Sequence, residues 1–88
     1  TRYCMKTIEE ARKEIDELDD KLTAAFLSRI KLAAKIGDKK RACGAPVEDV
    51  ARENEIIERL TRDLPEKESM AVKSLYDRIF SLCKAAQK

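Results

Sequence analysis

Apolar residues recur along the first half of the chain with the spacing of one long helix. Between about residues 7 and 42 they fall into two heptad registers, which are Ile8, Ile15, Leu22 and Ile36, and Ala11, Leu18, Ala25 and Leu32. This pattern predicts a helix of about 36 residues, roughly 54 Å long at ~1.5 Å per residue. Gly44 and Pro46 predict its end, because glycine commonly terminates a helix and proline cannot continue one.

Two shorter helices are predicted after this break. Asp49 is a good N-cap for the first, whose apolar face is Ile56, Ile57, Leu60 and Leu64. Pro65 lies where a helix often begins, and the face that follows is Met70, Val72, Leu75, Ile79, Leu82 and Ala86. Because no segment has a strand pattern, the sequence predicts an all-α fold, a three-helix protomer with one long N-terminal helix.

The long helix cannot be covered by the rest of its own chain. A compact domain of 88 residues has a radius of gyration of only ~12 Å, so two short helices cannot enclose a rod of this length. We therefore expect an intertwined helical homodimer, in which two long helices pack antiparallel about Phe26. We expect residues 1–88 to form a single domain, with residues 1–6 as a frayed N-terminal extension.

Charge and composition exclude several classes of function. The 19 basic and 17 acidic residues alternate and give a net charge of +2, unlike the basic patch of a nucleic-acid-binding protein. No apolar run approaches the ~18 residues of a membrane span. Histidine is absent and the three cysteines have no CxxC spacing, so neither zinc binding nor histidine-dependent catalysis is expected. The thiols suit a reducing, cytoplasmic environment.

Two residues of the long helix place positive charge on or beside its apolar seam. Arg29 lies midway between Leu22 and Ile36, and Lys40 follows on nearly the same face, ~16 Å away. Arg12 shares the register of Lys40 but is ~42 Å from it along the helix. In an antiparallel dimer, Arg12 of one chain would approach Lys40 of the other, which predicts two equivalent cationic sites. The alternative for Arg29 is a snorkelling side chain whose guanidinium reaches water.

The shorter helices add polar side chains to their apolar faces. Glu53 leads into the apolar face of the second helix, with Arg52 beside it, and Cys83 and Gln87 form an i,i+4 pair on the third. One interpretation is a structural network in which Arg29, Arg52 and Glu53 satisfy one another, because buried charges need partners. The other is a site for an anion, because cations outnumber anions in this set and arginine pairs with carboxylates in bidentate geometry.

Gly37 lies inside the predicted long helix, where a glycine costs ~1 kcal/mol relative to alanine. Close approach of a ligand or of another helix would explain this residue. A tolerated surface glycine is the alternative.

Four ordered stretches carry a family resemblance: ARKEIDELDDKL (11–22), LSRIKLAAKIGDKK (27–40), GAPVEDVAREN (44–54) and IFSLCKAAQ (79–87). Over nearly its whole length the chain resembles the all-helical chorismate mutases of the shikimate pathway. The resemblance implies an intertwined dimer that rearranges chorismate to prephenate in phenylalanine and tyrosine biosynthesis, without a metal or organic cofactor. The rival hypotheses are an isochorismate–pyruvate lyase on the same scaffold and a non-catalytic helical dimer.

The resemblance also implies a role for each candidate catalytic residue. Arg12 would reach the partner's active site and bind a substrate carboxylate, and Arg29 would bind a carboxylate in its own protomer's site. Lys40 would contact the ether oxygen and a carboxylate, and Gln87 would donate a hydrogen bond to the ether oxygen. Catalysis would then consist of conformational restraint and electrostatic stabilisation of that oxygen.

Four further residues are implied to bind substrate. Asp49, through its backbone, and Glu53 would hold the ring hydroxyl, and Arg52 would add positive potential near the ring carboxylate. Cys83 stands where the family usually has serine, and a thiol is a weaker hydrogen-bond donor than a hydroxyl. We therefore expect a weakened carboxylate contact at this position, unless Cys83 serves to fill an apolar gap.

Overall fold

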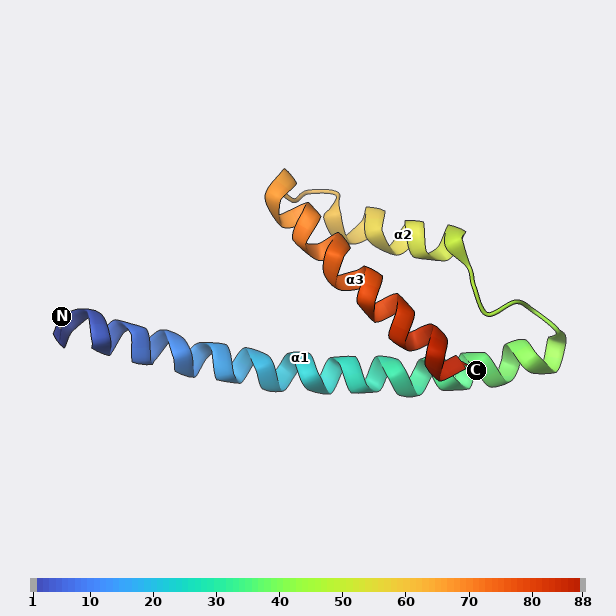
Figure 1. The fold of residues 1–88 in the computed structure, drawn as a ribbon, viewed down its shortest axis with the longest axis horizontal. Helices are drawn as coiled ribbons and strands as arrows, with labels where there is room; N and C mark the ends of the chain where they lie inside the picture. The colour runs from blue at the N-terminus through green and yellow to red at the C-terminus, as the bar shows by residue number, and fades with distance from the viewer. Residues whose placement is uncertain (1, 88) are drawn as a thin grey trace.

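The computed structural model describes residues 2–87, with side chains from Thr7 to Gln87. Three helices make up most of this segment: α1 (Arg2–Cys43), α2 (Val50–Thr61) and α3 (Glu66–Gln87). In Figure 1, α1 is a single rod, and α2 and α3 form a helical hairpin above its C-terminal half. Residues 2–87 contain no strand, which confirms the predicted all-α class and the order of the helices.

The C-terminal end of α1 is where the sequence predicts it, but its start is not. Gly44 has a φ of 75°, and two hydrogen bonds close the end, from Gly44 N to Arg41 O (3.4 Å) and from Ala45 N to Lys40 O (2.9 Å). The predicted start near residue 7 was wrong, because α1 begins at Arg2 and no glycine or proline precedes residue 7. Thr1 and the side chains of residues 2–6 lie outside the described residues, so the frayed extension stays a prediction.

The two shorter helices begin at the capping residues that the sequence indicates. The carboxylate of Asp49 accepts a hydrogen bond from Arg52 N (3.0 Å), and its carbonyl accepts one from Glu53 N (3.1 Å), so Asp49 is the N-cap of α2. Pro65 directly precedes α3, and its carbonyl accepts a hydrogen bond from Ser69 N (2.9 Å). These hydrogen bonds define where α2 and α3 begin.

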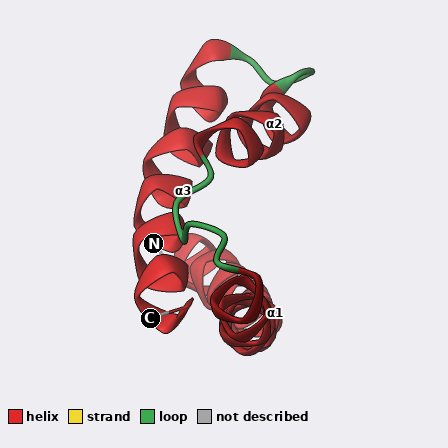
Figure 2. Cartoon of the chain, turned by 90° about the vertical axis from the view of Figure 1, so that its right-hand side faces the viewer, coloured by secondary structure: helices red, strands yellow, loops and turns green. Residues whose placement is uncertain are grey.

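The core is small and lies where α3 packs against α1 and α2. Figure 2 shows both of those helices on the same side of α3, α1 near its C-terminus and α2 toward its N-terminal half. The buried side chains of the described part are Ala33, Ile56, Phe80 and Cys83. A Cβ atom at Gly37 would lie only 2.5 Å from the carbonyl oxygen of Gln87. The close approach of a second helix therefore explains this glycine, rather than a tolerated surface position.

Among the described residues, no other helix lies beside the N-terminal half of α1 (Figure 1). Its apolar seam is exposed, by 47% at Ile8, 53% at Ile15, 61% at Leu18 and 58% at Leu22. On α3, Met70 and Leu75 of the predicted apolar face are exposed as well. The chain measures 61 Å along its longest axis and has a radius of gyration of 17.4 Å. Among the described helices, none combines the length and the apolar character that crossing a bilayer requires.

Candidate active site

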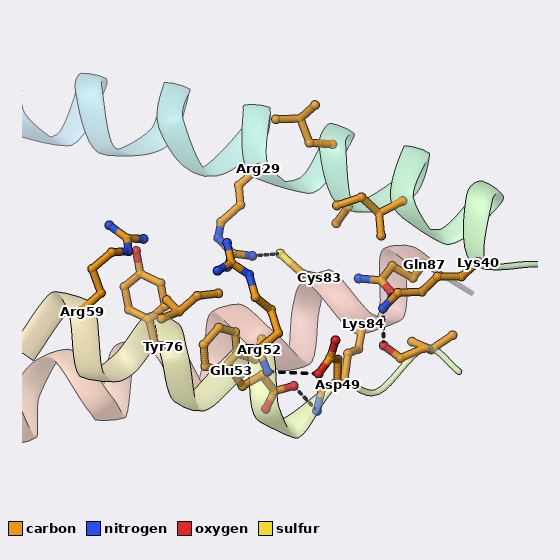
Figure 3. Close-up of a pocket in the computed structure, with 16 residues that line it drawn as sticks. Arg29, Lys40, Asp49, Arg52, Glu53, Arg59, Tyr76, Cys83, Lys84 and Gln87 are labelled. Carbon is orange, nitrogen blue, oxygen red and sulfur yellow. Dashed lines mark hydrogen bonds and ion pairs between the residues drawn. The ribbon is translucent and has the colours of Figure 1, made fainter. Parts of the chain in front are cut away.

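A cavity of about 450 Å³ lies between the C-terminal half of α1, the α1–α2 loop, α2 and α3. Seven of the eight candidate site residues line it: Arg29, Lys40, Asp49, Arg52, Glu53, Cys83 and Gln87. Figure 3 shows side chains from all three helices converging on this space. The eighth, Arg12, lies on the uncovered half of α1 and does not line the cavity.

Arg29 points from α1 toward α3 and is held there by three contacts (Figure 3). Its Nη1 donates a hydrogen bond to the Cys83 sulfur at 3.0 Å. Its guanidinium carbon lies 5.8 Å from the ring centroid of Tyr76 and 5.7 Å from that of Phe80, within cation–π range. The snorkelling alternative is therefore wrong, because the guanidinium lies over aromatic rings at the cavity wall.

Lys40 and Gln87 form a pair across the α1–α3 contact. The Lys40 ammonium donates to Gln87 Oε1 (3.2 Å) and to the carbonyl of Val47 (2.9 Å). An ammonium has three N–H donors, so one stays available for a ligand. Because lysine can only donate, it fixes the glutamine oxygen toward itself and leaves the Nε2 donors pointing elsewhere. In Figure 3 that nitrogen points away from Lys40 and into the cavity.

The backbone of Gln87 is held against α1 by two further features. Gly37 leaves room for it, and Arg41 Nη1 donates a hydrogen bond to the Gln87 carbonyl. Arg41 also pairs with Asp38 one turn earlier. The last turn of α3 is thus fixed on α1 independently of the contact that Gln87 makes with Lys40.

Glu53 pairs with a lysine that the sequence did not single out. Lys84 Nζ lies 3.2 Å from Glu53 Oε2 and 3.2 Å from Glu48 Oε1. Hydrogen bonding to Glu53, and next to Glu48, raises the pKa of Lys84. Arg52 pairs instead with Glu55, at 3.5 Å. The alternative in which Arg29, Arg52 and Glu53 satisfy one another is therefore wrong, since each has a different partner.

Three lining residues with polar side chains escaped the sequence reasoning: Arg59, Tyr76 and Lys84. For two of them a signal existed, because Arg59 follows Arg52 by seven residues and Tyr76 precedes Cys83 by seven. Lys84 lies three residues before Gln87 on α3, but no spacing along the chain places it beside Glu53. Only the packing of α3 beside α2 brings it to Glu53.

The charges around the cavity favour a small anion. Five cations line it, Arg29, Lys40, Arg52, Arg59 and Lys84, against the carboxylates of Asp49 and Glu53. One carboxylate caps α2 and the other pairs with Lys84, so neither neutralises the remaining cations. Within the described residues no cluster of His, Cys, Asp or Glu has the makeup of a metal site. Fold and site together define an all-helical protein with a cationic pocket suited to a small anion.

The comparisons with known proteins agree with this class. Residues 11–88 match the family Chorismate mutase type II, and the chain belongs to that family. It is 33% identical over 89 residues to a bifunctional chorismate mutase/prephenate dehydratase of Aquifex aeolicus, covering 96% of this chain and 25% of the relative. It is 33% identical over 58 residues to a chorismate mutase of Methanocaldococcus jannaschii, covering 66% of this chain and 59% of that protein. No solved structure matches.

A second bifunctional relative, from Escherichia coli K12, is 41% identical over 49 residues, which cover 56% of this chain and 13% of the relative. The chain thus spans about a quarter or less of the bifunctional relatives that it matches. The family match begins at residue 11 and so includes Arg12 together with every cavity-lining candidate. The resemblance inferred from the four sequence stretches is confirmed.

Proposed function

We propose that this chain catalyses the rearrangement of chorismate to prephenate, as a homodimer with two shared active sites. One observation carries the proposal: in a member of this family, Arg29, Lys40 and Gln87 line one cationic cavity. The reaction breaks one C–O bond as it forms one C–C bond, and it needs no nucleophile and no proton transfer. A site without histidine, in a chain that contains none, is suited to such chemistry.

The ether oxygen gains negative charge as its bond to the ring stretches, and Lys40 and Gln87 are placed to stabilise it. Lys40 offers its remaining N–H donor, and Gln87 offers the amide nitrogen that points into the cavity. Both groups are already fixed before substrate binds, so they need not reorganise as the charge develops. This preorganisation is the electrostatic part of the proposed catalysis.

The two carboxylates of chorismate require cations on opposite sides of the folded substrate. Arg29, fixed over Tyr76 and Phe80, supplies one of them. We assign the second to the partner subunit's Arg12. Holding both carboxylates keeps the enolpyruvyl arm over the ring, in the geometry that reacts. Arg52 adds positive potential, and Cys83 supports Arg29 through the contact at its sulfur.

The ring hydroxyl is assigned chiefly to Glu53. The carboxylate and the carbonyl of Asp49 already accept hydrogen bonds that start α2. Glu53 uses only Oε2 for Lys84 and keeps Oε1 for the substrate. Asp49 therefore positions the start of α2, and we assign it the weaker contact with the ring hydroxyl.

The exposed seam of α1 supports the proposed dimer. Arg12 and Lys40 each lie fourteen residues from Phe26, so an antiparallel pair of helices centred there brings them together. Leu32 and Ile36 line the cavity, although they are 57% and 48% exposed, so the cavity is open along that seam. A second α1 would close it. We place the protein in the cytoplasm, because Cys43 and Cys83 are free thiols.

The test is turnover by the purified chain of chorismate and, separately, of isochorismate, with the products identified by mass. We expect prephenate from chorismate. Pyruvate release from isochorismate alone would instead identify a lyase. A dimer that turns over neither compound would identify a non-catalytic module.

A further inference from the structure

Lys84 bridges two helices at the edge of the cavity. It lies on α3, next to Cys83 in sequence, and its ammonium is 3.2 Å from Glu53 on the first turn of α2. The Glu53 side chain is 24% exposed and that of Lys84 is 29% exposed, so the pair is largely shielded from water. Glu48, the other partner of Lys84, is 65% exposed.

The bridge has two consequences for Glu53. A lysine only donates, so the contact engages Oε2 and turns Oε1 toward other donors, and Oε1 has no partner among the described residues. The ammonium also offsets one of the two carboxylates on the wall of a cavity that four further cations line, the other carboxylate being the α2 cap Asp49. Without it, an unpaired carboxylate would repel a dianionic ligand.

We propose that Lys84 is a positioning residue for the rearrangement: it orients Glu53 so that Oε1 accepts the ring hydroxyl, and it offsets the Glu53 charge against the substrate. This assignment rests on the proposed function and deepens it. Lys84 acts through Glu53 and does not touch the reacting atoms.

The protonation state of Lys84 fits this role. Its two carboxylate partners raise its pKa above the ordinary value of 10.5, so the charged form persists at neutral pH. Because the folded pKa is raised, the contribution of the pair is complete below the ordinary value and is lost only as the pH rises through the raised one. The effect of Lys84 on activity should therefore be constant between about pH 6 and 9.

A double-mutant cycle separates positioning from other roles. Lys84→Met should lower kcat/KM about tenfold, well short of the ~10²-fold that a 1 Å misplacement of reacting groups can cost. A rise in KM should contribute most of the loss, because the change restores repulsion of the dianion. Lys84→Arg should recover most of the activity. In a Glu53→Gln background, where the carboxylate that Lys84 orients at the cavity is absent, Lys84→Met should change kcat/KM by less than about twofold.

Glu48→Gln is the matched control, because it removes the other partner of Lys84 without altering the cavity. It should leave kcat/KM within about twofold of the unmodified chain. If Glu48→Gln costs as much as Lys84→Met, the bridge is only structural and the proposal is overturned. Additive losses in the cycle would also overturn it, because Lys84 would then act without Glu53.

Lys84→Gln repeats the measurement where Lys84→Met does not fold, with helicity followed by circular dichroism. If the unmodified chain turns over chorismate and Lys84→Met or Lys84→Gln matches it, the Lys84 assignment fails while the function stands. If the unmodified chain does not turn over chorismate, the function itself fails, and the Lys84 assignment fails with it.

Discussion

The two halves of α1 have the same heptad pattern but different surroundings. In the C-terminal half, Ala33 is 4% exposed and Gly37 touches the end of α3. In the N-terminal half, Leu18 and Leu22 are 61% and 58% exposed. The heptad residues themselves are exposed in both halves, Leu32 by 57% and Ile36 by 48%, so the contact with α3 uses a different face of the same helix. The exposed apolar seam of the N-terminal half has no partner among the described residues, and we propose that a second copy of α1 covers it and that Arg12 reaches the second site in this way.

A charge in the N-terminal seam should have the largest effect. Leu18→Glu would bury a carboxylate between two α1 helices, so we expect monomers at micromolar concentration and loss of nearly all activity. Lys13→Glu places a carboxylate on the same half of α1 but outside both heptad registers, so this control should keep the dimer. Sedimentation velocity measures both variants. A dimeric, active Leu18→Glu protein would remove the distinction between the two halves.

In the C-terminal half, the largest loss should come from the pair that faces the ether oxygen. Lys40→Ala and Gln87→Ala should each lower kcat by ~10²–10³-fold, as removal of an oxyanion-hole donor does. Their melting temperatures should fall little, because the backbone of Gln87 is also held by Arg41. Steady-state kinetics measures kcat, and thermal denaturation measures the melting temperature. Near-normal turnover by Lys40→Ala would contradict the assignment.

The pH profile of Gln87→Glu tests separately whether residue 87 donates a hydrogen bond to the ether oxygen. Glutamine does not titrate, so its contact with the ether oxygen should be constant across neutral pH. A glutamate donates only when protonated, so the optimum of Gln87→Glu should move toward acid. An unchanged profile would show that residue 87 does not donate to the substrate.

The next effect tests how closely the C-terminal half is packed. Alanine normally stabilises a helix by ~1 kcal/mol relative to glycine. At position 37 its Cβ would lie 2.5 Å from backbone of Gln87, and overpacking of this kind costs ~1–3 kcal/mol. Gly37→Ala should therefore lower both the melting temperature and kcat, while Ser28→Ala, at an exposed position of α1, should change neither. A more stable Gly37→Ala protein with unchanged kcat would show that α3 can move away freely.

The smallest effect concerns Cys83. Its sulfur is buried and accepts a hydrogen bond from Arg29. Cys83→Ser should keep or raise kcat/KM by a small factor, because a hydroxyl is a better donor than a thiol. A lower melting temperature without a kinetic gain would show that the thiol serves to fill an apolar gap.

Much of this organisation could be predicted from spacing within single helices. The long helical run of α1, the stop at Gly44 and the cap at Asp49 are local features, and the structure confirms them. Arg29 and Lys40 were found because they share a helix face with the apolar seam. Lys84 was missed because its significance depends on which carboxylate α2 brings beside α3, and no spacing along the chain encodes that contact.

The role of Gly37 also depends on a contact between helices that spacing along the chain does not encode. Its sequence context permitted a ligand, a helix or empty surface, and only the crossing of α3 decides among them. The start of α1 was placed too late because the first register begins at Ile8, although Cys4 continues the second register seven residues before Ala11 and no glycine or proline breaks the helix there.

The central claim is that each site takes Arg29 from one chain and Arg12 from the other, and complementation tests it most directly. Arg12→Ala and Arg29→Ala homodimers should both be nearly inactive. After joint unfolding and refolding in equal amounts, half the dimers are mixed and each has one complete site, so activity should recover to about one quarter of the unmodified value per site. Persistent inactivity, with mixed dimers confirmed by native mass spectrometry, would contradict the shared site.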